Sequence, residues 1–238
     1  MSGSGIWADL ADLVLPVECA GCRGSGRRLR HGVCVSCQSF LSALRPDSVR
    51  PTPAPAGLPP CVALGGYDGV LRELLLSYKE RGRHGLARPL GFLLAEVVAA
   101  ALQSDRRPVL LIPVPATAKA VRQRYGDHLW RLSRYTAGRL RAAGWPVMLA
   151  QPLRALPRPD SALLDSAGRA AASATAFRLR AGRLPALRRA VSGRSVIMLD
   201  DIVTTGATLS SVSRLLVTAG VQVEAAALLA ATRRRYRP

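Results

Sequence analysis

The 238-residue sequence has no long uninterrupted apolar stretch, although 49% of its residues are hydrophobic. Glu96 interrupts the apolar run at residues 90–102, so we expect no membrane span. The N-terminus lacks the basic segment of a secretory signal, and Asp9 and Asp12 interrupt its apolar residues. We therefore expect a cytoplasmic protein, and the hydrophobic content argues against a disordered chain.

Lysine is also scarce, since only Lys79 and Lys119 contribute to the 34 basic residues and arginine carries almost all of the net charge of +19. The arginines are spread along the chain together with much alanine, leucine, glycine and proline, a joint bias that genome base composition can produce. Such a charge favours nonspecific contact with nucleic acids. The dense cluster at residues 233–237 can equally be a solvated tail.

Two common phosphate-binding fingerprints are absent, because the chain has neither the Gly-Lys-Ser/Thr ending of a Walker A loop nor Gly-x-Gly-x-x-Gly. A different pattern occupies residues 195–208. Its apolar start, residues 195–199, predicts a strand that is buried on both faces of a parallel sheet. Asp200 and Asp201 follow at the carboxyl edge, where open α/β sheets bind their ligands. Ordinary folding does not require two adjacent carboxylates there.

The turn after these carboxylates suits a phosphate group. A glycine allows close backbone approach, and residues 206–219 predict a helix whose N-terminus offers free N–H groups and a positive dipole end. Threonine hydroxyls add further donors. The alternative is a strand end whose aspartates cap the helix or are solvated. The residues of the predicted loop are Thr204, Thr205, Gly206, Ala207 and Thr208.

Four cysteines near the N-terminus form two Cys-x-x-Cys pairs, which are Cys19 with Cys22 and Cys34 with Cys37. This spacing predicts a closed tetrahedral site for a structural zinc ion, with no open position for a reacting water. Two disulfides or a redox pair are the alternatives, but a reducing compartment disfavours disulfides. Cys61 stands apart in an apolar run, where a small buried thiol is expected.

The rest of the chain predicts three parts: a zinc module at residues 1–44, a linker at 45–60 that is rich in proline and alanine, and a main domain at 61–238. Alternating strands and helices in the main domain predict an α/β fold with a parallel sheet flanked by helices. Residues 154–176 have only weak strand or helix character. We expect strands at 61–67, 109–114, 146–150, 195–199 and 221–229, and helices at 70–79, 86–102, 127–143 and 206–219.

Four further segments precede the strand, acidic pair and Thr-Thr-Gly-Ala-Thr loop of residues 196–208. In this order the chain resembles the ComF family, in which a cysteine module precedes a type I phosphoribosyltransferase domain. The segments are Tyr-Asp-Gly-Val-Leu-Arg at 67–72, Tyr-Lys-Glu-Arg-Gly at 78–82, Ile-Pro-Val-Pro at 112–115 and Arg-Gln-Arg-Tyr-Gly-Asp at 122–127.

The resemblance implies a site for phosphoribosyl pyrophosphate (PRPP) with Mg²⁺. Asp200 and Asp201 would contact the ribose hydroxyls, and the loop at 204–208 would hold the 5′-phosphate. Pyrophosphate would bind Val114, Pro115, Ala116 and Thr117, with cations of Lys79, Arg122 and Arg124 nearby. Arg169 would belong to a loop that closes over the site. Arg122 and Arg124 can also be a solvated helix start, and the stem of Lys79 can lie along the surface.

The sequence departs from the family pattern in two places, and we expect these departures to affect catalytic turnover more than PRPP binding. Arg124-Tyr125-Gly126-Asp127 stands where the family commonly has Arg-Gly-Phe-Asn, and Ser161 and Ala172 replace amide residues that flank Arg169. We expect a PRPP-binding protein that transfers phosphoribosyl to an unidentified acceptor, with Asp200, Asp201, Arg124 and Arg169 as the catalytic set. The alternative is a protein of DNA uptake or repair that contacts DNA or DNA-processing proteins and has a non-catalytic pocket.

Overall fold

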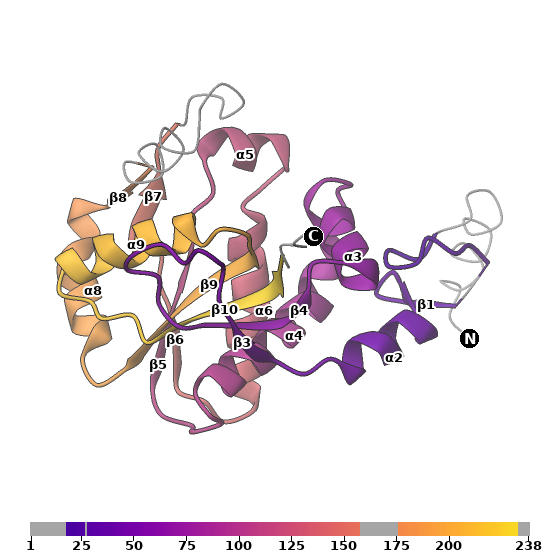
Figure 1. The fold of residues 1–238 in the computed structure, drawn as a ribbon, viewed down its shortest axis with the longest axis horizontal. Coiled ribbons are helices and arrows are strands. Elements are labelled where there is room, and N and C mark those ends of the chain that lie inside the picture. The colour runs from indigo at the N-terminus through magenta and orange to yellow at the C-terminus, as the bar shows by residue number, and fades with distance from the viewer. Residues whose placement is uncertain (1–17, 27, 158–175, 233–238) are drawn as a thin grey trace, which may run out of the picture.

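A computed structural model describes residues 18–26, 28–157 and 176–232, and its centre is a six-stranded sheet (Figure 1). The strand order is β3-β4-β10-β9-β5-β6. Neighbouring strands pair in parallel, except that β3 pairs antiparallel with β4. The bounds are β3 Asp47–Val49, β4 Cys61–Gly66, β5 Val109–Pro113, β6 Val147–Leu149, β9 Ser195–Val203 and β10 Ala225–Ala231.

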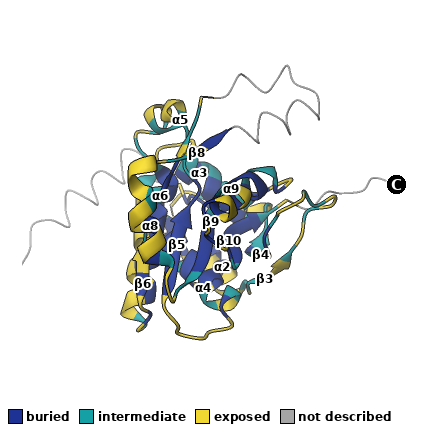
Figure 2. Cartoon of the chain, turned by 90° about the vertical axis from the view of Figure 1, so that its left-hand side faces the viewer, coloured by how far each residue is buried: buried dark blue, intermediate teal, exposed yellow. Residues whose placement is uncertain are grey.

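The three central strands, β5, β9 and β10, form the core of the molecule. Every residue of β5 is buried, and so are six of the seven residues of β10. Helices cover both faces of the sheet, so β5 and β10 are continuously apolar rather than alternating, whereas β9 is apolar until its two aspartates. Figure 2 shows them as buried, while the outer surfaces of α6 (His128–Ala142) and α8 (Leu184–Val191) are exposed.

The helix α4 (Ala87–Ala101) packs against α6 and contacts β4 and β10, and α9 (Ala207–Thr218) lies on the opposite face of the sheet (Figure 1). The two helices α4 and α6 approach closely at Gly91, where an added Cβ atom would lie 2.6 Å from that of Tyr135. The Thr136 hydroxyl donates a 3.0 Å hydrogen bond to the Gly91 carbonyl. Further helical segments of the main domain are α3 Gly69–Lys79, η1 His84–Leu86, α5 Ala118–Gln123 and η3 Ala181–Arg183.

The segment His84–Ala101 is, within the described residues, long and apolar enough to cross a membrane by length and composition, with a mean hydropathy of 1.2. The sequence led us to expect no membrane span, and a test of length and composition alone is weak evidence for one. A core helix of a soluble protein passes the same test, and seven residues of α4 are buried, in a helix that packs against the sheet and α6. Glu96 lies on its exposed side, so the charge that interrupts the apolar run remains hydrated.

The N-terminal module consists of the short antiparallel pair β1 (Leu29–Arg30) and β2 (Val33–Cys34), followed by α2 (Val35–Ala43). It lies beside α3 (Figure 1). The Ser77 hydroxyl of α3 donates to the Ala20 carbonyl at 3.1 Å, and Arg23 forms a 2.8 Å ion pair with Glu73. An added Cβ atom on Gly21 would lie 2.9 Å from Val70, so the module and α3 are in close contact.

Most predicted elements occur within a few residues of their expected bounds, but three differ. Strand β9 continues through Asp200 and Asp201 to Val203, because β10 pairs with it over this whole length. Residues 47–49 of the segment predicted as a linker form β3. The antiparallel pair β7 (Leu153–Ala155) and β8 (Phe177–Leu179) lies at the two ends of the weakly patterned region, and residues 158–175 lie outside the described part.

Candidate active site

A cavity of about 350 Å³ lies at the carboxyl ends of β5 and β9. It brings together side chains that are far apart in the sequence, including the acidic pair, the segment after β5 and the first turn of α9. The fold therefore assembles much of the predicted site in one place. The predicted residues that line this cavity are Lys79, Val114, Pro115, Ala116, Thr117, Arg124, Asp200, Asp201 and Thr208.

Asp201 is held by two partners that reach the same carboxylate oxygen. Its Oδ2 atom lies 3.0 Å from Lys79 Nζ and 2.9 Å from His128 Nε2. Burial alone would raise the pKa of Asp201, but the His128 hydrogen bond and the Lys79 charge hold it below its usual range. Asp201 is therefore a carboxylate at neutral pH.

Asp200 has the opposite electrostatic environment. Burial and the neighbouring Asp201 charge raise its pKa to about 8, although the Asp201 backbone N–H donates to Asp200 Oδ1 at 2.9 Å. Two adjacent carboxylates in one cavity cannot both be ionised cheaply, so their pKa values separate. A ligand that brings hydroxyl donors or a cation would stabilise the charged form of Asp200.

His128 is a component of this site that the sequence analysis did not identify. It is buried at the start of α6, directly after Asp127, whose side chain accepts the Trp130 N–H and caps the helix. The Tyr78 hydroxyl donates to the His128 carbonyl at 2.6 Å, and the two rings meet edge to face at 6.2 Å. These contacts fix the position from which the imidazole reaches Asp201. Asp127 as a helix N-cap could have been recognised from the sequence. A single histidine has no spacing pattern that would indicate its role.

The segment after β5 forms a turn at the cavity wall and continues into α5. The Thr117 side chain accepts the Ala120 N–H at 3.2 Å and caps this helix. Arg124 lines the cavity and pairs with Glu80 at 2.8 Å. Arg122 is exposed and does not line the cavity, in agreement with the solvated alternative, and Arg169 lies outside the described residues.

The predicted phosphate loop is divided between two cavities. Thr208 lines the cavity that contains the aspartates, whereas Thr204 and Thr205 line a larger neighbouring one. Gly206 has a left-handed backbone with φ of +75°, and it precedes the first residue of α9. This turn places the N-terminus of a twelve-residue helix at the carboxyl edge of β9, where the helix dipole would stabilise a phosphate dianion.

The four cysteines form a second candidate site, which is structural. Their sulfur atoms all lie within 4.8 Å of one another, and the Sγ atoms of Cys22 and Cys34 are 3.7 Å apart. Tetrahedral coordination with Zn–S bonds of about 2.3 Å requires sulfurs about 3.8 Å apart. The backbone N–H groups of Gly21 and Cys34 donate to Cys19 Sγ, and such bonds stabilise a thiolate ligand. The donor set therefore fits zinc.

One comparison with known proteins concerns the C-terminal part of the chain. Residues 164–238 match the family model described as the phosphoribosyl transferase domain. The match supports a type I phosphoribosyltransferase domain, and the structure has the corresponding mixed α/β architecture with a mostly parallel sheet between helices. No curated protein matches the chain.

Proposed function

We propose that this protein binds PRPP with Mg²⁺ in the cavity at the ends of β5 and β9 and transfers its phosphoribosyl group to an acceptor. The observation that carries the proposal is the meeting of Asp200, Asp201 and Lys79 with residues 114–117 and Thr208 in one cavity. Carboxylates suit ribose hydroxyls, whereas the helix N-terminus and the cations suit phosphates. ComF-family membership remains part of this proposal.

The chemistry at this site would be substitution at C1 of the ribose. The C1–O bond to pyrophosphate breaks with its electron pair going to the leaving group, while the acceptor's lone pair forms the new bond. Asp200 and Asp201 would hold the ribose hydroxyls and balance the positive charge that develops on the ring. Residues 114–117 and Lys79 would hold pyrophosphate. Mg²⁺ would supply charge neutralisation, held mainly by pyrophosphate, hydroxyls and waters.

The N-terminal residues have a structural part in the same proposal. Residues 1–44 would form a zinc module, residues 45–60 the connection, and residues 61–238 the phosphoribosyltransferase domain. A closed four-cysteine site contributes folding free energy and offers no open position for catalysis. Zinc would therefore stabilise the N-terminal module, which packs against α3. The transfer reaction would take place in the cavity at the ends of β5 and β9.

Isothermal titration calorimetry with PRPP and Mg²⁺ tests the assignment. We expect saturable binding by the wild-type protein and at least a tenfold loss in Asp201→Asn, because hydrogen bonds to a charged group contribute about 1.5–3 kcal/mol. Asp105→Asn is the matched control, since its side chain is 66% exposed and pairs only loosely with Arg107. Equal binding by Asp201→Asn and the control would contradict the site.

A second function, contact with nucleic acid, has one specific observation in its favour. Arg154 and Arg178 are direct partners in the β7–β8 pair, and both are exposed. Like charges placed opposite each other destabilise a sheet. A bound polyanion would reduce the electrostatic repulsion between these two arginines. Within the described residues neither arginine has an acidic partner.

Salt-dependent binding to a single-stranded oligonucleotide tests this second function. Replacing Arg154 and Arg178 by glutamate should weaken the affinity and flatten its dependence on salt. The control replaces Arg188 and Arg189, two exposed arginines of α8, and makes the same change in net charge. If both double substitutions weaken the oligonucleotide affinity equally, the effect comes from net charge and not from the β7–β8 pair. Undetectable binding at low salt would refute this second function.

A further inference from the structure

The N-terminal cysteine module contacts the main domain through the two residues that lie between its first pair of cysteines. Ala20 is 1% exposed, and its carbonyl accepts a 3.1 Å hydrogen bond from the Ser77 hydroxyl of α3. An added Cβ atom on Gly21 would lie 2.9 Å from Val70 Cγ1, which also belongs to α3. The surface that packs on α3 is therefore the turn between two of the four cysteines.

Hydrogen bonds inside the module connect this turn to the second pair of cysteines. The Ala20 N–H donates to the Gly32 carbonyl at 2.9 Å. The Cys34 N–H donates to Cys19 Sγ at 3.2 Å, so the two cysteine pairs are also joined directly. The position of the Ala20 carbonyl therefore depends on the arrangement of the whole four-cysteine site.

The last three residues of α3 contact three different parts of the molecule. Ser77 contacts the cysteine module, and the Tyr78 hydroxyl donates to the His128 carbonyl at 2.6 Å. Lys79 Nζ lies 3.0 Å from Asp201 Oδ2. Consecutive residues of an α-helix point about 100° apart, so one short segment can reach all three places. Close packing transmits small displacements, and a shift of Ser77 would therefore also move Lys79.

The chain that follows α3 is held against the module by further hydrogen bonds. The Arg83 guanidinium donates to the Glu18 carbonyl at 2.6 Å, and the Arg83 backbone N–H donates to the Ser77 carbonyl at 3.1 Å. The Arg81 guanidinium donates to Ser77 Oγ at 3.2 Å. Ser77 is therefore the residue at which the module, α3 and the segment after α3 meet.

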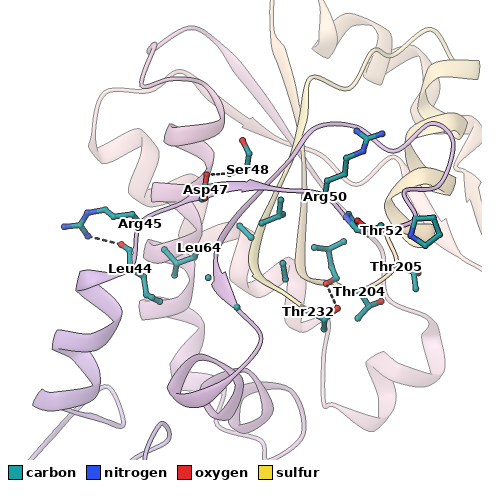
Figure 3. A pocket seen from close by; sticks show the side chains of 18 of the residues that line it. Leu44, Arg45, Asp47, Ser48, Arg50, Thr52, Leu64, Thr204, Thr205 and Thr232 are labelled. Atoms are coloured by element: carbon teal, nitrogen blue, oxygen red, sulfur yellow. Dashed lines mark hydrogen bonds between the residues drawn. The ribbon is translucent and has the colours of Figure 1, made fainter. Parts of the chain in front are cut away.

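Another side of the module borders a cavity and not the active-site residues. The end of α2 and the segment after it, including Leu44 and Arg45, line a cavity of about 790 Å³ (Figure 3). Thr204 and Thr205 of the predicted phosphate loop line the same cavity. This side of the module thus faces open space, whereas α3 touches the module directly. The direct connection to Asp201 therefore runs through α3.

We propose that the cysteine module is an allosteric site, at which metal binding positions Lys79 beside Asp201 through Ser77 and so raises the affinity for PRPP. The inference rests on the proposed function. A closed metal site orders the chain that supplies its ligands. In the metal-loaded state the ordered turn holds Ser77 and the end of α3, whereas in the metal-free state this end of the helix frays. Allosteric coupling is reciprocal, so PRPP should raise the affinity for zinc by the same factor.

Zinc competition with a chromogenic chelator on the full-length protein tests this coupling, with and without PRPP and Mg²⁺. PRPP should raise the zinc affinity of the wild type at least about fivefold, which is the lower end of typical allosteric coupling. Because PRPP itself binds zinc, Asp201→Asn is the control at a PRPP concentration that saturates only the wild type, and it should show no increase. Equal zinc affinity with and without PRPP, in a protein that binds PRPP, would contradict the proposal.

A double-mutant cycle tests the path through Ser77. Ser77→Ala should weaken the PRPP affinity of the zinc-loaded protein about fivefold, but less than about twofold in a Lys79→Met background, because Ser77 acts through Lys79. Ser133→Ala is the matched control, since this buried serine of α6 donates to the Leu129 carbonyl at 2.8 Å. It should leave PRPP affinity unchanged in both backgrounds. Equal weakening by Ser77→Ala in both backgrounds would reveal a general structural effect and refute the positioning role.

The outcomes separate this proposal from the proposed function. If PRPP and zinc both bind without affecting each other, the coupling is wrong and both sites stand. If PRPP does not bind, the proposed function fails and the coupling fails with it. If zinc does not bind, the metal site and the coupling fail, and the PRPP site stands. Thermal unfolding of Ser77→Ala and Lys79→Met verifies that a loss of PRPP binding does not result from unfolding.

Discussion

One oxygen atom of Asp201, a residue that is 7% exposed, accepts interactions from both Lys79 and His128. A buried carboxylate without partners would be strongly destabilising, so each partner has a structural as well as an electrostatic effect. Lys79 comes from the end of α3 and His128 from the start of α6. The position of Asp201 therefore depends on two helices as well as on β9.

His128 should act as a positioning residue for Asp201. His128→Leu removes the hydrogen bond and should weaken PRPP affinity about tenfold, because a hydrogen bond to a charged group contributes about 1.5–3 kcal/mol. His128→Gln keeps an N–H donor and should retain most of the affinity. Calorimetry on the two variants, with thermal unfolding as a control for stability, measures the difference. Equal loss in both variants would mean that only the packing of the imidazole matters.

The predictability of the site differed from residue to residue for physical reasons. Asp200 and Asp201 were recognisable because two carboxylates after an apolar run are costly in an ordinary core. His128 was not, since its role depends on helices that approach each other only in the fold. Arg122 and Arg124 have the same charge and nearly the same position in the sequence. Only the fold separates the exposed Arg122 from Arg124, which lines the cavity.

At the scale of elements, α3 connects the cysteine module to the candidate active site. Its side facing the module carries Glu73 and Ser77, which contact Arg23 and Ala20. The last two residues of the helix, Tyr78 and Lys79, contact the backbone of His128 and the carboxylate of Asp201. A shift of α3 would therefore change contacts both in the cysteine module and at Asp201.

The turn between β9 and α9 depends on glycine. Gly206→Ala should destabilise the protein by about 1–2 kcal/mol, because a non-glycine residue is strained at a φ of +75° and its Cβ atom would press on Leu58. Gly138→Ala is the control, since this exposed glycine in α6 has open space around it and should gain up to about 1 kcal/mol. Urea denaturation measures both, and equal stability of the two variants would contradict the strain.

Elements with strong patterns were predictable, whereas short ones were not. The central strands have apolar runs and the long helices have a 3.6-residue periodicity, and both patterns can be recognised in the sequence alone. Strand β3 is only Asp-Ser-Val, which is too short for a recognisable sequence pattern. It becomes a strand because it pairs with β4, which comes later in the chain. The predicted end of β9 is too early, because the aspartates indicate a strand end, whereas β10 pairs with β9 up to Val203.

For the whole molecule, the cysteine cluster should behave as a folding unit that requires metal. We expect one zinc ion per chain, and Cys34→Ser should lower the melting temperature by several degrees because an incomplete ligand set loses metal-linked stability. Metal analysis and thermal unfolding measure these quantities. Cys61→Ser is the control, since this buried thiol lies outside the cluster and donates only to the Pro59 carbonyl. Unchanged stability of Cys34→Ser would refute a structural metal site.

A crystal structure of the complex with PRPP and Mg²⁺ would show whether the cavity at the ends of β5 and β9 binds PRPP. We expect the ribose hydroxyls at Asp200 and Asp201, the 5′-phosphate at the loop of residues 204–208 and pyrophosphate at residues 114–117. PRPP bound elsewhere, or bound here with its phosphates at the aspartates, would refute this site.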